Sequence, residues 1–167
     1  MLKITIGSRI PRKKIQVIEN GENMIMRAKV KDSEILASLA IQMWTEHDIE
    51  DMAEEFRKLL MNEEAVCFIK FEDDKPVGFA QCQLRHDYVE GTESSPVGYL
   101  EGIFVAKENR KHGYAAELLT ECEKWAKEMG CIEFASDCEL VNEDSLKFHM
   151  ALGFEEANRI ICFRKDI

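Results

Sequence analysis

The sequence lacks the features that mark several large classes of protein. No continuous apolar stretch has the length of a signal peptide or a membrane span, so we expect no membrane partner and a cytoplasmic location. The 6 cysteines include no C-x-x-C pair, and several lie inside apolar runs. That pattern favours buried free thiols over a disulfide framework or a zinc site. Repeats and low-complexity segments are also missing.

The sequence is also short of basic residues. Lysine and arginine total 22 against 32 aspartates and glutamates, which gives a net charge of −10 with the acidic residues spread along the chain. A nucleic-acid-binding protein normally presents a basic face, so we expect no nucleic acid partner. An acidic surface can collect small polycations, although solubility alone explains the total charge equally well.

The chain of 167 residues is long enough for one compact domain with its own core. We place that domain at residues 24–167. Residues 1–23 differ, with basic residues around Pro11 and an alternating segment at 2–6. They form either an added hairpin or an N-terminal extension that precedes an alternative start at Met24.

Apolar periodicity from residue 24 onward predicts an α/β fold with a mixed sheet and helices on both faces. The element order is β-α-α-β-β-β-α-β-α-β-β. Parallel, right-handed crossovers are expected only through the third and fourth helices. The predicted strands span 25–30, 65–71, 77–84, 97–105, 131–135, 154–157 and 160–164, and the helices span 33–44, 49–60, 114–129 and 144–152.

The segment 110–115 joins the strand at 97–105 to the helix at 114–129, and it is rich in features that suit an anion. Amides at the start of a helix, together with the helix dipole, favour negative charge there. Arg110 and Lys111 add cationic donors, and Gly113 lets the backbone approach a ligand closely. Taken alone, the loop fits an ordinary strand-to-helix turn equally well.

A second motif lies downstream at the spacing of a known family. The sequence resembles the GNAT superfamily of acetyl-CoA-dependent N-acetyltransferases over residues 24–167. The motifs that carry this resemblance are Arg110, Gly113 and Ala115 in the loop, then Asn142, Ser145, Phe148-His149 and Gly153-Phe154. A narrower similarity, to the aminoglycoside 6'-N-acetyltransferases, rests on residues 87–103, 133–137 and 152–154.

The resemblance implies transfer of an acetyl group from acetyl-CoA to the 6'-amine of an aminoglycoside, by direct attack in a ternary complex, with antibiotic resistance as the result. The alternative is a GNAT enzyme that acetylates a polyamine, another small amine or a protein N-terminus. A binding module without turnover is the third hypothesis. By the same analogy we expect a homodimer, with acetyl-CoA as co-substrate and no metal.

Two carboxylates are the candidate catalytic pair. Glu101 interrupts an apolar strand, where a charge is costly unless it faces a wet cleft or a partner. Asp137 follows the next strand, at the end where α/β sheets hold ligands. The resemblance places substrate carboxylates at both positions and makes Asp137 the base, directly or through a water. Without it, Glu101 reads as a half-exposed strand residue and Asp137 as a loop or cap residue.

The resemblance also supplies the remaining site residues. Trp44, His47 and Tyr88 match positions that line the aminoglycoside cleft, although Trp44 also reads as a core residue and Tyr88 as a loop anchor. Asn158 stands where close relatives carry a substrate-contacting glutamate. His149 stands where most GNAT enzymes carry a tyrosine general acid. A histidine pKa near about 6.5 suits that role, but a plain helix residue is the other reading.

On the cofactor side, the pyrophosphate is expected on the loop and the pantetheine arm along the preceding strand, as an added strand would lie. An amide of that strand would also hold the thioester oxygen. The expected cofactor contacts are Ile103, Phe104 and Val105 on the strand, Arg110, Lys111, His112, Gly113, Tyr114 and Ala115 in the loop, and Asn142 by resemblance.

Overall fold

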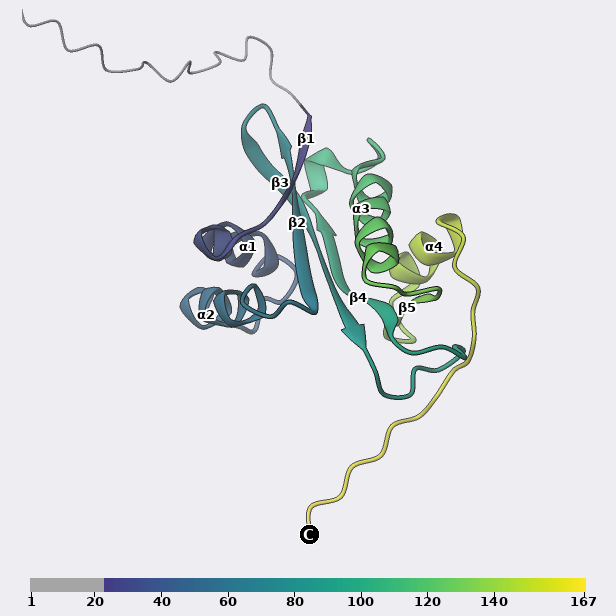
Figure 1. Ribbon diagram of the computed structural model, residues 1–167. Coiled ribbons are helices and arrows are strands. Elements are labelled where there is room, and N and C mark those ends of the chain that lie inside the picture. The colour runs from purple at the N-terminus through teal and green to yellow at the C-terminus, as the bar shows by residue number, and fades with distance from the viewer. Residues whose placement is uncertain (1–22) are drawn as a thin grey trace, which may run out of the picture.

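The computed structural model describes residues 23–167 and has the predicted mixed α/β architecture (Figure 1). Residues 1–22, on which the prediction of a hairpin or an extension falls, lie outside that range. The strands are β1 (Met24–Arg27), β2 (Ala65–Glu72), β3 (Lys75–Arg85), β4 (Val97–Val105) and β5 (Phe134–Ser136). The helices are α1 (Ser33–Ala40), α2 (Ile49–Leu59), α3 (Tyr114–Glu128) and α4 (Glu143–Ala151), with 3-10 turns η1 (Val30–Asp32) and η2 (Lys107–Asn109).

The sheet has the strand order β1-β2-β3-β4-β5. The first four strands are antiparallel neighbours, and β5 joins β4 in parallel after the crossover through α3. Helices α1 and α2 lie on one face of the sheet, and α3 and α4 lie on the other (Figure 1). The prediction of helices on both faces is confirmed, as is the parallel crossover through the third helix. No helix among residues 23–167 is long and apolar enough to cross a membrane.

Each face of the sheet carries its own core. Under α1 and α2, Phe79 is fully buried and meets the rings of Trp44 and Phe56 edge-on, with ring centroids 6.2 and 5.9 Å apart. Under α3, Leu118 and Trp125 pack against apolar side chains of β2, β3 and β4. The sheet is therefore fixed from both sides, which gives side chains at its edges a rigid support.

A β-bulge in β4 decides which way Glu101 faces. Gly102 lies opposite Gln81 and Leu100 lies opposite Cys82, so Glu101 is the extra residue of the bulge. Such a bulge shifts the alternation of side chains along the strand. Leu100 packs in the core under α3, whereas Glu101 reaches polar side chains of β3 on the α1 and α2 face. The bulge thereby frees a charged residue from the core.

The two predicted strands at 154–157 and 160–164 are wrong for this structure. After α4 the chain turns at Gly153, where φ is +87°, and runs past the end of the sheet with no secondary structure (Figure 1). A strand requires a hydrogen-bonded neighbour, and within residues 23–167 the last strand of the sheet is β5. Consequently, the predicted crossover through the fourth helix reaches no strand.

Element boundaries also differ from prediction, most of all at β1, α1 and β5. Strand β1 ends at Arg27 rather than at residue 30, which instead begins the 3-10 turn η1. Helix α1 ends at Ala40 rather than near Trp44, because the residues that follow form turns. Strand β5 begins at Phe134 rather than at residue 131. The Cys131 N–H donates to the carbonyl of Ala126, which makes Cys131 part of the closing turn of α3.

Candidate active site

The two candidate carboxylates lie on one connected network of side chains. Arg85, the last residue of β3, donates from Nε and Nη2 to Glu101 Oε1 (3.1 and 2.9 Å) and from Nη2 to Oε2 (2.9 Å). The same guanidinium lies 3.3 Å from the ring centroid of Tyr99. The Tyr99 hydroxyl in turn donates to Asp137 Oδ2 at 2.7 Å. Glu101 and Asp137 are therefore linked through Arg85 and Tyr99.

The strand order explains how this network forms. Strands β3, β4 and β5 are neighbours, and each supplies one part of the network or leads directly to it. Burial raises the pKa of the Tyr99 hydroxyl well above its usual value, and the hydrogen bond to Asp137 raises it further. Tyr99 consequently stays protonated at neutral pH and acts as a fixed donor to Asp137.

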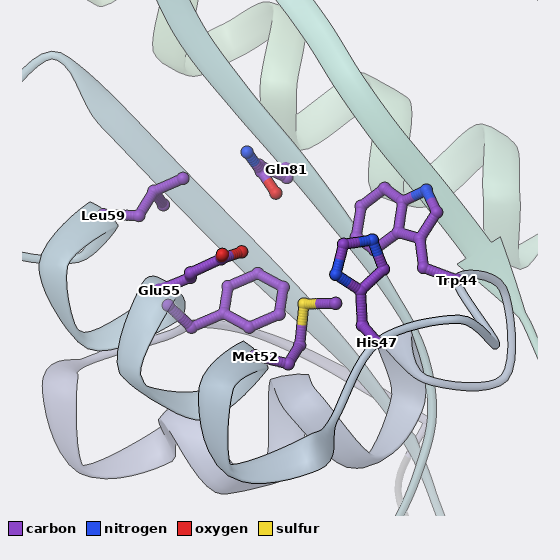
Figure 2. A pocket seen from close by; sticks show the side chains of 7 residues that line it. Trp44, His47, Met52, Glu55, Leu59 and Gln81 are labelled. Carbon is purple, nitrogen blue, oxygen red and sulfur yellow. The ribbon is translucent and has the colours of Figure 1, made fainter.

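Next to this network, α2 and the segment before it enclose an open cavity of about 260 Å³ (Figure 2). Trp44 and His47 lie on the connection between α1 and α2, and Gln81 enters from β3. Apolar side chains of α2 form the floor, and Glu55 adds a carboxylate. A neighbouring surface hollow is strongly acidic and is lined by Glu46, His47, Asp48, Asp51, Glu54, Glu55 and Lys58.

The cavity adjoins the carboxylate network through Trp44. A Cβ atom placed on Gly102 would lie 3.1 Å from the Trp44 ring, so the indole lies directly over the residue that follows Glu101. Glycine at that position is what allows the ring to approach the strand so closely. The structure thus brings Trp44 and His47 together with Glu101 on the face of the sheet that α1 and α2 cover.

Tyr88 and Asn158 form a separate group. Tyr88 is 81% exposed and donates to Glu90 Oε2 at 3.0 Å, while Asn158 donates from Nδ2 to Glu90 Oε1 at 2.9 Å. These hydrogen bonds lower the pKa of Glu90, the one from Asn158 most strongly. Neither residue lines the Trp44 cavity, and Glu90 had not been singled out from the sequence. The loop that carries Tyr88 and Glu90 still reaches the network, because Val89 packs with Tyr99.

That loop is held by Glu133, which the sequence reasoning also missed. Its carboxylate accepts hydrogen bonds from the backbone N–H groups of Glu93 and Ser94, at 3.0 and 2.6 Å, and from the Ser94 hydroxyl. The hydroxyl contact is the main reason that the pKa of Glu133 is lowered. An acidic residue directly before β5 thus ties the loop after β3 to the sheet.

Beyond Leu100, strand β4 has a free edge. Strand β5 pairs with β4 only at Gly98, Tyr99 and Leu100, so residues 102–105 have no neighbour on that side among the described residues. The N–H of Ala106 points to β3, where it donates to Val77, so by alternation the amides of Ile103 and Val105 face the gap. Phe104 instead turns its backbone to β3 and its buried side chain to the core under α1 and α2. An extended ligand can pair with this edge.

The loop after this edge opens directly onto α3. Gly113, with φ +85°, occupies the N-cap position and offers no side-chain cap, and Lys111 also has a positive φ of 67°. The first amides of α3 therefore face outward beside Lys111 and His112, which are both exposed. Arg110 uses its Nε to hold the Val105 carbonyl at 3.0 Å.

Tyr114 and Ala115 belong to the packed side of this helix start. The Tyr114 ring is buried, and its hydroxyl donates to Glu72 of β2. Ala115 is half-buried against the same core. Each of these two residues therefore offers a ligand its backbone amide, while its side chain anchors the helix.

His149 and Asn142 lie on α4, beyond the end of β5. Asn142 caps the helix, since its Oδ1 accepts from the Ser145 N–H at 3.1 Å. His149 Nδ1 lies 2.7 Å from the Ser145 carbonyl, and Nε2 lies 3.0 Å from the Ser136 hydroxyl. A carbonyl only accepts, so we assign the hydrogen to Nδ1. In the neutral ring Nε2 is then an acceptor.

These geometric features agree with the comparisons to known proteins. The Acetyltransferase (GNAT) family matches residues 33–154. The aminoglycoside N(6')-acetyltransferase type 1 of Serratia marcescens is 41% identical over 131 residues, which are 78% of this chain and 90% of that protein. The Stenotrophomonas maltophilia protein of the same name is 39% identical over 144 residues, 86% of this chain and 93% of that protein.

Solved structures give the same result. The aminoglycoside N-acetyltransferase AAC(6')-Iy in complex with CoA has a TM-score of 0.85 and 36% identity, and the match covers 90% of this chain and 99% of that one. The aminoglycoside 6'-N-acetyltransferase AAC(6')-Ih from Acinetobacter baumannii has a TM-score of 0.83 and 35% identity, over 87% and 99%. The chain therefore belongs to the GNAT family of acetyltransferases and, within it, to the aminoglycoside 6'-N-acetyltransferases.

Proposed function

We propose that this protein transfers the acetyl group of acetyl-CoA to the 6'-amine of aminoglycoside antibiotics and thereby confers resistance to them. The observation that carries the proposal is the linked pair of carboxylates, Glu101 and Asp137, beside an aromatic cavity with an acidic rim. A polycationic sugar fits such a surface through its ammonium groups and its ring faces. A related structure, AAC(6')-Iy with 37% identity, was solved with the bisubstrate analog CoA-S-monomethyl-acetylneamine.

In the proposed reaction the acceptor nitrogen attacks the thioester carbonyl carbon, the C–S bond breaks and CoA leaves as its thiolate. Asp137 takes the proton that the nitrogen loses, directly or through a water, because its Oδ1 remains available while Oδ2 is held by Tyr99. The amides of Ile103 and Val105 face the gap where the pantetheine arm would lie and are the donors available to the thioester oxygen.

The pyrophosphate is proposed to lie on the amides that begin α3, with Lys111 and His112 beside it. Asn142 retains a free amide group toward the cofactor while its Oδ1 caps α4. The neutral His149 ring has no proton at Nε2 to give to the thiolate. That supports solvent, or His149 only in its protonated form, as the proton source for CoA.

The acceptor class is tested by following acetyl transfer to kanamycin, spermine and a peptide with a free N-terminus. Product should be measured by mass spectrometry, because the exposed Cys138 and Cys162 would react with a thiol reagent. We expect acceleration by aminoglycosides with a 6'-amine and none by a matched drug with a hydroxyl at that carbon. Turnover of spermine or the peptide without turnover of any 6'-amino drug would instead establish the alternative GNAT activity.

We further propose that the protein is a homodimer in which the C-terminal segment 154–167 of one copy covers the other. Its apolar residues Ile160, Ile161 and Phe163 are 66, 80 and 91% exposed. Strand β5 is the last strand of the sheet, and exposed apolar side chains lie close by at Ile132 and Met150. A free edge with apolar surroundings is a typical docking site for an extended segment.

Light scattering after size exclusion tests the dimer. The variant Ile161→Asp/Phe163→Asp should elute as a monomer, whereas the control Arg164→Ala/Asp166→Ala, which changes only an exposed ion pair of the same segment, should remain a dimer. A monomeric parent protein would contradict the proposal. We also propose a cytoplasmic location, supported by free cysteines at Cys67, Cys82, Cys122, Cys131, Cys138 and Cys162.

A further inference from the structure

The Glu101 carboxylate is already paired with a cation before any substrate arrives. Arg85 approaches it with two nitrogens at 2.9 and 3.1 Å, and the side chains of Arg85 and Glu101 are only 39 and 18% exposed. The stacking of the guanidinium on the Tyr99 ring holds Arg85 in place. A substrate ammonium at Glu101 would therefore meet an ion pair and not a bare carboxylate.

The two oxygens of Glu101 are unequally occupied. Oε1 accepts three hydrogen bonds, from Gln83 Nε2 at 2.9 Å and from Arg85 Nε and Nη2. Oε2 accepts one hydrogen bond, from Arg85 Nη2. A carboxylate has about four acceptor sites, so the free capacity lies on Oε2. An acceptor amine is expected to donate to that oxygen, within reach of the guanidinium charge.

The charge of Arg85 matters because only a neutral amine can attack a thioester. A carboxylate next to an ammonium stabilises the charged form and so delays proton loss, and a nearby cation does the opposite. Around Glu101, the negative charges of Glu101 and Asp137 are opposed by Arg85, while Tyr99 stays neutral. The other titratable groups nearby are Cys82, a buried thiol behind the strand, and His47 and Glu55, in the adjoining cavity.

We propose that Arg85 is a positioning residue for acetyl transfer: it neutralises Glu101, so that Glu101 binds the acceptor amine by a hydrogen bond without trapping it as an ammonium ion. This inference rests on the proposed function and concerns the same site. It assigns Arg85 a role in setting the protonation state of the acceptor, beyond supporting the strand. Specificity follows as well, since Arg85 disfavours an acceptor that stays fully charged at Oε2.

The test is the pH dependence of kcat for Arg85→Gln, with 6'-amino aminoglycoside and acetyl-CoA both saturating. Without the positive charge of Arg85, Glu101 should move the acidic limb of the pH profile to higher pH by about one unit, which lowers kcat at pH 7 about tenfold. KM for the drug should fall, because the ammonium form binds more tightly, and kcat should approach the parent value at high pH. Arg85→Lys, which keeps the positive charge, should return the acidic limb to its pH in the parent protein.

Two further variants separate this role from a merely structural one. Arg85→Met fills similar volume above the Tyr99 ring and should shift the limb as Arg85→Gln does. When Glu101→Gln is already present, adding Arg85→Gln should shift the acidic limb much less than it does in the parent protein. A uniform loss of kcat at every pH with a raised KM, or an equal shift in both backgrounds, would overturn the proposal. Failure of the proposed function is a different result, because the parent protein itself would then acetylate no aminoglycoside.

Discussion

The substitution Asp137→Asn removes the proposed base while keeping its position in the site. Tyr99 donates its hydroxyl hydrogen to Asp137 Oδ2 at 2.7 Å, and the side-chain oxygen of an asparagine can accept the same hydrogen bond. Because Asp137 is exposed, its replacement leaves no cavity and no buried unpaired group. The variant therefore isolates the loss of proton acceptance from a loss of structure.

The size of the effect follows from the exposure of the residue. A positioned general base contributes on the order of 10²–10⁴-fold to a rate. Water has access to Asp137 and can take over part of the proton transfer, which places the expected loss at the lower end, about 10²-fold in kcat at pH 7. The loss should shrink as pH rises, since hydroxide and the neutral amine both become more abundant.

The measurement is kcat and KM for a 6'-amino aminoglycoside between pH 6 and pH 9, with the product quantified by mass spectrometry. Asp74→Asn is the matched control: Asp74 lies in the turn between β2 and β3, and its φ of +60° is one that asparagine also adopts. We expect the control to match the parent. Equal turnover of Asp137→Asn and parent at every pH would refute the assignment of Asp137 as the base.

Three further predictions test the packing, the loop and the thiols. Phe79→Ala, at a fully buried aromatic cluster, should lower the free energy of unfolding in urea by about 3–5 kcal/mol. The pKa of Glu133 in the folded protein lies below its value in the unfolded chain. The stability that Glu133 contributes is therefore fully present above the unfolded pKa and is lost as the pH falls through the folded pKa. Glu133→Gln should consequently show a smaller loss of Tm from pH 7 to pH 3 than the parent. An equal loss would contradict this. A thiol reagent should modify only Cys138 and Cys162 in the native protein, because the other cysteines are buried and burial raises the pKa of Cys67.

Most of the fold follows from sequence periodicity, because its elements are long and strongly patterned. Strand β4 has the predicted bounds 97–105. Helices α2 and α3 differ from prediction by one residue at the C-terminal end, and α4 differs by one residue at each end. The loop 110–115 also lies where expected, at the start of α3. These segments carry local signals, such as the Asp48 cap of α2 and the helix stop at Gly130, that depend little on the rest of the chain.

The site is less accessible from sequence, because its key contacts depend on register. Strict alternation along β4, counted from Phe104, would place Tyr99 and Glu101 on the face of the sheet opposite to Phe104. The bulge at Glu101 instead brings Glu101 onto the face that Trp44 covers. The partnership of Arg85 with Glu101 follows from the pairing of β3 with β4. One signal was available: Arg85 ends a polar series with Gln81 and Gln83 at every second position of its strand.

The C-terminal segment shows a different limit of structure prediction from sequence. Apolar alternation at 154–164 predicts strands, but a strand forms only where a neighbouring strand can pair with it. Among residues 23–167 no strand pairs with this segment, and Ile160, Ile161 and Phe163 are exposed. The apolar pattern indicates that these residues are suited to burial, but it does not specify which surface covers them.

A crystal structure of the protein with CoA and a 6'-amino aminoglycoside tests the account most directly. The account predicts that the 6'-nitrogen lies within hydrogen-bond distance of Glu101 Oε2, with Arg85 still paired to that carboxylate, and that Asp137 is reached from the same nitrogen directly or through one water. A drug bound only on the acidic surface of α2, with its 6'-nitrogen away from Glu101 and Asp137, would contradict it.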